Sequence, residues 1–295
     1  MATLKELKTK IASVKNTQKT TRAMKLVSTA KLKRAEEALL SSRVYAKKIE
    51  EVMEEISAKL ASIKDSISLR AFADVKTQNK VDIIVVTADK GLCGGFNIHT
   101  IKAALNKLEE LKEKKVKVRL KVIGKKAIEY FRFVGIEMFE EYIGLSSSPD
   151  YDKAAKIIEE SYNDFVNEEI DNIFVIHNGY VNKLTQEVHV KELLPIEVNS
   201  TKENTNEFLE VEPKDDYEAI LESLVKKYLE YTMYYTLLDS LAGEHSARMQ
   251  AMDAATNNAQ EMVRQLTLQF NKVRQENVTR ELIEIVTAIE AMKKK

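Results

Sequence analysis

Apolar side chains recur every three or four positions along the first sixty-odd residues. Leu4, Leu7, Ile11, Val14 and Thr21 form one run, and Ile49, Val52, Ile56, Leu60, Ile63 and Ile67 form another. Between the runs the stripe thins to Ala30, Ala35 and Ala38, whose small side chains allow a neighbour to approach closely. This spacing is typical of a helix that packs against another helix over most of its length.

The C-terminal part of the chain has a matching apolar stripe. Its members are Leu238, Leu241, His245, Met249, Met252, Ala255, Ala259, Met262, Leu266, Phe270 and Val273. Pro213, followed by Asp215 and Asp216, marks a plausible helix start, because acids are favoured near the positive end of the helix dipole. Gly243 interrupts the pattern and predicts either close packing or a bend. We therefore expect a second long helix.

The middle of the chain alternates between strand and helix patterns. Predicted strands cover Val81–Val86, Val116–Ile123, Ile136–Tyr142, Ile173–His177 and Leu184–Leu194, and predicted helices cover Thr100–Glu113, Lys125–Val134 and Tyr151–Glu169. Such alternation favours a mostly parallel α/β sheet, with the last two strands as an antiparallel edge. Asn199–Asn206 reads as a polar loop that leads to the last helix.

Glycine and proline are confined almost entirely to this middle part. Residues 1–90 contain neither, and residues 214–295 contain only Gly243. The predicted fold is a long antiparallel coiled coil of the N- and C-terminal helices, with a central Rossmann-like α/β domain at its base. We expect the first helix within residues 1–75, the α/β domain within 76–208 and the last helix within 209–295.

Composition narrows the class of protein. The formal net charge is zero, yet residues 1–34 hold ten Lys or Arg and one acid, Glu6. The first Tyr is Tyr45, so this basic face lacks the aromatics of a nucleic-acid site, and an acidic protein partner fits better. One cysteine, Cys93, suits a reducing compartment. No apolar run is long enough for a membrane span, and we expect a mature N-terminus rather than a transit peptide.

The loop Ala88–Asn97 (ADKGLCGGFN) is the most enzyme-like segment. A Gly-rich turn before a helix can bind phosphate, but this loop fits neither phosphate-binding fingerprint, and a tight structural turn is the simpler interpretation. Cys93 and His99 do not define a nucleophilic triad, and the four His show no metal-ligand spacing. We expect no catalytic residue, no metal and no cofactor.

Polar, uncharged residues crowd the end of the last helix. They include Gln269, Asn271, Gln275, Asn277, Thr279 and Thr287. A strongly apolar seam would hold one partner arrangement, whereas such a surface can hold several arrangements weakly. This pattern suits an interface that does not lock into one register.

Three separated motifs resemble the gamma subunit of F-type ATP synthase of the bacterial type. They are Ile11–Ala35, the loop Ala88–Asn97 and Ala247–Met292, where the last includes the run ARMQAMDAATNNA and the signature that begins at Val278. The resemblance covers the whole chain. Thr287, Ala288 and Ile289 stand where the family commonly has Ser-Gly-Ala, which predicts a stiffer terminus. No cysteine-containing insertion precedes the last helix, which speaks against the thiol-regulated chloroplast variety.

The resemblance implies a central rotor shaft that couples proton flow through the membrane sector to conformational change at catalytic beta subunits. Implied partners are the alpha and beta subunits, the epsilon subunit and the c-subunit ring. Nucleic acid is not among them. The implied location is the cytoplasmic face of the bacterial plasma membrane, with indirect attachment through the c ring. The implied beta-subunit contacts are Met24, Lys25, Arg248, Gln275, Thr279 and Glu281.

Two alternatives remain open from the residues alone. A static coiled-coil scaffold would tolerate charge reversal on the basic face of the first helix. A nucleotide-binding α/β enzyme with a helical arm would bind nucleotide as an isolated chain.

Overall fold

The computed structural model describes residues 3–62, 70–72, 79–196 and 217–293. The expected polar loop Asn199–Asn206, the helix start at Pro213 and both domain boundaries lie outside these residues, as do Ile63 and Ile67. The chain divides into two compact units. One contains residues 1–28 and 249–295, and the other contains residues 29–248.

Two long helices begin and end the described chain. Helix α1 covers Leu4–Ser62 and helix α5 covers Tyr217–Lys293, with 59 and 77 residues respectively. In the unit of residues 1–28 and 249–295, Thr256 Oγ1 donates to Thr21 Oγ1 and Lys25 pairs with Asp253. The sequence numbers fall along one helix as they rise along the other, so the helices are antiparallel.

The same helices also pack against each other within residues 29–248. Ala35 and Leu39 of α1 form a buried cluster with Leu238 and Ala242 of α5. Farther along, the Tyr231 hydroxyl donates to the Ser42 carbonyl. The predicted pair of long antiparallel helices is therefore confirmed, because each unit shows side chains of α1 and α5 in contact.

The expected thinning of the α1 stripe to alanines was partly wrong. Ala30 is exposed, whereas Ser28 and Leu32 are buried, and the stripe continues through Ala35 and Leu39. The apolar pattern did not reveal this register, because the buried position between Thr21 and Leu32 is occupied by Ser28, which is polar. The correct spacing is still three and four residues, so the helix keeps one continuous buried face.

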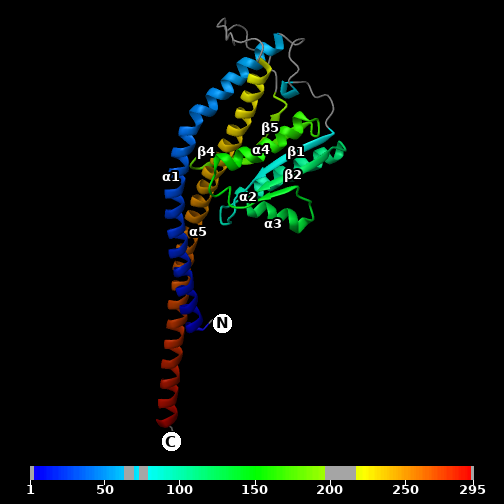
Figure 1. Ribbon diagram of the computed structural model, residues 1–295. Coiled ribbons are helices and arrows are strands. Elements are labelled where there is room, and N and C mark those ends of the chain that lie inside the picture. The colour runs from blue at the N-terminus through cyan, green and yellow to red at the C-terminus, as the bar shows by residue number, and fades with distance from the viewer. Residues whose placement is uncertain (1–2, 63–69, 73–78, 197–216, 294–295) are drawn as a thin grey trace. The chain divides into compact units, whose positions relative to one another are not determined.

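A five-stranded sheet forms the centre of the unit of residues 29–248 (Figure 1). Its strands are β1 (Lys80–Val86), β2 (Lys117–Ile123), β3 (Glu140–Tyr142), β4 (Asn172–Asn182) and β5 (Thr185–Leu194). The order is β3-β2-β1-β4-β5, with parallel pairing except between β4 and β5. The mostly parallel sheet and its antiparallel edge are as predicted.

Three helices connect the strands and cover both faces of the sheet. They are α2 (Phe96–Glu113), α3 (Lys125–Val134) and α4 (Tyr151–Val166), and Arg70–Phe72 forms a short 3₁₀ turn. Helices α2 and α3 pack on one face, around Ala104 and Phe131. Helix α4 and the first turns of α5 pack on the other, around Ile158 and Leu229. The Rossmann-like prediction is confirmed, since a doubly wound sheet has helices on both faces.

A buried carboxylate links the central strands to α4. Asp82 on β1 accepts two bonds from Arg119 of β2, at 2.6 and 2.8 Å, and one from Ser161 Oγ at 2.8 Å. Arg119 also pairs with Asp164 at 2.6 Å. The bonds to Asp82 and Asp164 raise the pKa of Arg119, so the guanidinium stays charged.

Candidate functional site

The sheet has a switch point between β1 and β4, where the strand order reverses. In doubly wound folds, ligands bind in the crevice outside the carboxyl ends of the strands at this point. Here the carboxyl end of β1 is level with His177 of β4, because Val85 pairs with Ile176. Residues Asp239–Arg248 of α5 contact the backbone and side chains around this end of the sheet.

Gly243 allows the close approach of α5. A Cβ at this position would lie 2.8 Å from the carbonyl oxygen of Asn178 and 3.1 Å from Cε2 of Phe96. A Cβ on Gly179 would overlap the carboxylate of Asp239. That carboxylate accepts from the Tyr180 backbone N–H and lies 3.0 Å from His177 Nε2. The two glycines thus let a helix and a strand touch almost backbone to backbone.

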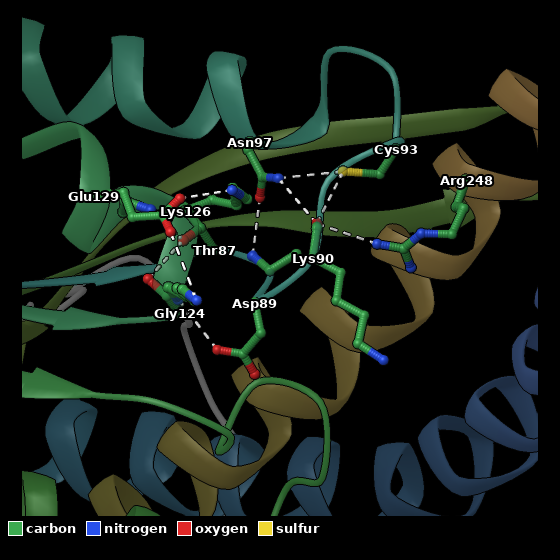
Figure 2. Close-up of polar contacts among 12 residues, drawn as sticks. Thr87, Asp89, Lys90, Cys93, Asn97, Gly124, Lys126, Glu129 and Arg248 are labelled. Atoms are coloured by element: carbon green, nitrogen blue, oxygen red, sulfur yellow. Dashed lines mark hydrogen bonds and ion pairs between the residues drawn. The ribbon is translucent and has the colours of Figure 1, made fainter.

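Arg248 fastens α5 to the Gly-rich loop. Its Nη2 donates to the carbonyls of Lys90 and Gly91, each at 3.2 Å, and Nη1 donates to Glu244 one turn earlier. Figure 2 shows the guanidinium aimed at the backbone of Lys90. The side chain of Arg248 is buried. Arg248 therefore uses most of its donors within this chain.

The loop is also held from inside. Asn97 Oδ1 accepts from the Ala88 N–H at 2.9 Å, while its Nδ2 lies 3.2 Å from Cys93 Sγ (Figure 2). Asp89 Oδ1 accepts from the N–H groups of Lys125 and Gly144. The expected tight structural turn fits this geometry, because loop side chains bond the loop and its neighbours.

Cys93 lies in an apolar environment, and no hydrogen bond described for it joins its thiol to a histidine. The thiol is buried beside Ala88, Phe96 and Ala247, and burial raises its pKa. His99, the nearest histidine in the sequence, is exposed. Within the described ranges, no three His, Cys, Asp or Glu side chains are grouped as metal ligands.

The contact residues predicted near the C-terminus lie on the surface of α5. Gln275, Thr279 and Glu281 are all exposed. Gln275 and Thr279 line one shallow hollow together with Lys272, Arg280 and Ile283. Glu281 is not among the residues of that hollow. The structure thus brings two of the three together on one face.

Met24 and Lys25 lie on α1 in the same unit. Both are partly exposed, and Lys25 Nζ pairs with Asp253 at 2.6 Å. Arg248 belongs to the other unit by its contacts. Sequence reasoning missed Asp239 and Glu244, which anchor α5 together with Arg248 and Gly243. Gly243 was the feature of the sequence that pointed to this contact, because a lone glycine inside a long helix indicates close packing.

His245 should make stability depend on pH. Burial, aided by the charges of Arg248, Lys31 and Lys90, lowers its pKa from 6.5 to about 4. As the pH falls, His245 takes up a proton in the unfolded chain before it does so in the folded chain. The contribution of the neutral imidazole to the free energy of unfolding is therefore fully present above pH 6.5 and is lost as the pH drops toward about 4. We expect His245→Gln to flatten this part of the curve of unfolding free energy against pH, measured by urea titration.

The comparison of the two curves isolates His245 from Glu244. Burial raises the pKa of Glu244, which works in the opposite direction in both proteins and cancels in the difference. Parallel curves for wild type and His245→Gln between pH 6.5 and about 4 would contradict a buried neutral imidazole.

Comparison with known proteins covers nearly the whole chain. The family model described as ATP synthase matches residues 3–292. The ATP synthase gamma chain of Nautilia profundicola is 78% identical over 294 residues, covering 100% of both chains. The gamma chain of Campylobacter curvus is 56% identical, covering 99% of this chain and 100% of its own.

Solved structures show the same fold. A chain of the Euglena gracilis mitochondrial ATP synthase rotor matches with a TM-score of 0.62 at 15% identity, covering 93% of this chain and 98% of its own. A chain of the Tetrahymena thermophila central stalk and c ring matches with 0.58 at 21% identity, covering 80% and 98%. Among the described residues, no helix has the length and apolar character to cross a membrane. By sequence along its whole length, the chain belongs to the gamma subunits of F-type ATP synthase.

Proposed function

We propose that this chain is the central rotor shaft of an ATP synthase and couples proton flow to conformational change at catalytic subunits. The observation that carries the proposal is the exposed apolar surface at the end of α5. Its members are Val278, Leu282, Ile283, Ile285, Val286 and Ile289. Large apolar side chains that gather exposed at one end of a helix are typical of a site of protein contact. A ring of subunits around the helix end would cover it.

The physical basis of coupling is unequal contact. One helix pair lacks threefold symmetry, so it touches three equivalent subunits differently. A site changes its nucleotide affinity only as far as the shaft prefers one of its conformations. Shifting the populations of two conformations of a site from 1:99 to 99:1 requires that the shaft bind one conformation more favourably by about 5.5 kcal/mol. A few charge-assisted hydrogen bonds of about 1.5–3 kcal/mol each reach that scale.

The contacts proposed with beta subunits are Met24, Lys25, Arg248, Gln275, Thr279 and Glu281. The exposure of Gln275, Thr279 and Glu281 supports a role outside the chain. Lys25 and Arg248 each have a carboxylate partner within the chain, Asp253 and Glu244. A beta-subunit acid would have to share or displace these partners, so both contacts carry an added cost.

Catalysis is proposed to reside in the beta subunits. The geometry supports this, because α5 fills the position where a doubly wound sheet binds its ligand, through Gly243 and Arg248. The α/β domain then serves to hold the shaft. Epsilon, the c ring and the alpha subunits are the other proposed partners, with attachment to the cytoplasmic face of the membrane through the c ring.

Replacing Gln275 by alanine is expected to lower ATP hydrolysis and ATP synthesis by the assembled complex several-fold, while the chain stays folded. The exposed amide makes no described hydrogen bond in the chain, so its loss removes only contacts with partners. Steady-state hydrolysis and proton-driven synthesis in membrane vesicles are the measurements. Gln260→Ala, also an exposed glutamine on α5, is the matched control.

Unchanged turnover with Gln275→Ala would remove Gln275 from the contact surface. The alternative of a static coiled-coil scaffold predicts another result. If the chain were such a scaffold, reversing the charges of Arg22, Lys25 and Arg34 together would leave ATP turnover by its partners unchanged.

A further inference from the structure

Two adjoining hollows lie between α1, α5 and the β4–β5 hairpin, all within residues 29–248. The larger has a volume of about 940 Å³ and the smaller about 340 Å³. Both are lined by Arg43, Lys191, Thr232 and Tyr235, so they meet along these four side chains. The volumes fall in the range of small-molecule sites, about 300–1,000 Å³.

The smaller hollow is cationic. Its charged lining residues are Arg43, Lys47 and Lys191, and no carboxylate is among the described side chains that line it. Lys47 is 3.7 Å from Glu51, a contact across one exposed helical turn. Arg43 makes no ion pair and no hydrogen bond with any residue that the structure describes. An unpaired guanidinium at the junction of two hollows is suited to a carboxylate or a phosphate.

The larger hollow has an aliphatic wall. Leu39 and Leu40 from α1 face the same space as Val181, Val188 and Val190 from the hairpin. Leu40, Val181 and Val190 are exposed to solvent there. Burying this wall under an apolar group would be favourable at about 25 cal/mol per Å².

The two acids of the larger hollow are already engaged. Glu36 accepts from the Tyr180 hydroxyl and lies 3.9 Å from Lys183. Asp239 accepts from the Tyr180 N–H and faces His177. His177 Nδ1 is buried without a hydrogen-bond partner in the described chain. Among the described lining residues, the joined hollows have three basic side chains, Arg43, Lys47 and Lys191, against the two acids Glu36 and Asp239, and they also contain the unsatisfied Nδ1 of His177.

We propose that these joined hollows bind an amphipathic anion, a phosphate or carboxylate with an aliphatic body. The anionic group sits at Arg43, Lys47 and Lys191, and the body lies against Leu40 and the hairpin valines. Two sources share this chemistry, a soluble alkyl phosphate or fatty acid and the headgroup and chain of an anionic phospholipid. The aliphatic wall favours a chain over the planar base of a nucleotide.

The test uses the purified full-length chain and isothermal titration calorimetry with monomeric octyl phosphate. Saturable binding is expected, at least about tenfold tighter than for inorganic phosphate or for octanol alone. Arg43→Gln and Leu40→Ser should each weaken it by about tenfold. Arg34→Gln is a matched control on an exposed arginine of α1, and Leu26→Ser matches Leu40, at 63% and 61% exposure.

A second arm separates the sources. Co-sedimentation with vesicles of phosphatidylglycerol, compared with phosphatidylcholine, reports a phospholipid occupant if Arg43→Gln abolishes it and Arg34→Gln does not. Binding of octyl phosphate without vesicle binding assigns a soluble amphiphile. Equal loss in the Arg43 and Arg34 variants, binding of ADP as tight as octyl phosphate, or no binding to either probe would overturn the proposal. Circular dichroism confirms that each variant is folded.

Discussion

Replacing Asp82 by alanine is expected to lower the free energy of unfolding by about 3–5 kcal/mol, because it breaks a buried ion pair. The carboxylate is completely buried and accepts from Arg119 and Ser161. Without it, Arg119 keeps one described ion-pair partner, Asp164, and Ser161 Oγ loses its acceptor. Urea unfolding followed by circular dichroism measures the loss.

Glu129→Ala is the matched control for this prediction. Glu129 pairs with Lys126 at 2.6 Å, but both side chains are substantially exposed and screened by water, so its loss should cost far less than the loss of Asp82. A cost for Asp82→Ala no larger than that for Glu129→Ala would show that the buried pair adds no stability. Asp82→Asn should fall between them, because an amide oxygen can still accept one bond.

Replacing Gly243 by valine is expected to detach α5 from the end of the sheet and to destabilise the chain by about 2–3 kcal/mol, as overpacking does. In an exposed helix, removing a glycine would stabilise by several tenths of a kcal/mol up to about 1. Here the added side chain meets the Asn178 carbonyl and the Phe96 ring, so the sign reverses. The backbone carbonyl cannot rotate away as a flexible side chain could.

Cys93 offers a local readout of the Gly243→Val change. It is the chain's one cysteine and is buried against Ala247 of α5. If α5 moves off the loop, the rate at which a thiol reagent labels Cys93 should rise about tenfold or more. About 1.4 kcal/mol of local destabilisation is enough for this, because it raises the population of locally opened molecules tenfold. Ala254→Val, at an exposed position of α5, controls for the valine itself. Equal labelling rates in the two variants would contradict a close helix–strand contact at Gly243.

The position of Arg248 limits what its sequence motif can mean. The motif and its helical register could be recognised from the sequence, and they implied a contact with a partner. The fold shows that the same guanidinium bonds the carbonyls of Lys90 and Gly91. Loop and helix are 157 residues apart, so no local pattern predicts this contact. The beta-subunit contact of Arg248 stays a prediction.

The sequence by itself determined the elements. Apolar spacing of three and four residues predicted α1 and α5, and the alternation of strand and helix patterns predicted the doubly wound sheet. These features are local, because periodicity and turn residues act over a few positions. The motifs in residues 247–292 also determined the family without any knowledge of tertiary contacts.

Only the tertiary structure decided which faces meet. It placed Ser28 and Leu32 rather than Ala30 in the helix seam, brought Gly243 against Asn178, and joined two hollows at Arg43. Each of these depends on packing between segments far apart in the chain. Side-chain volume and backbone approach at such contacts are set by both partners together, and neither segment's sequence contains the other's position.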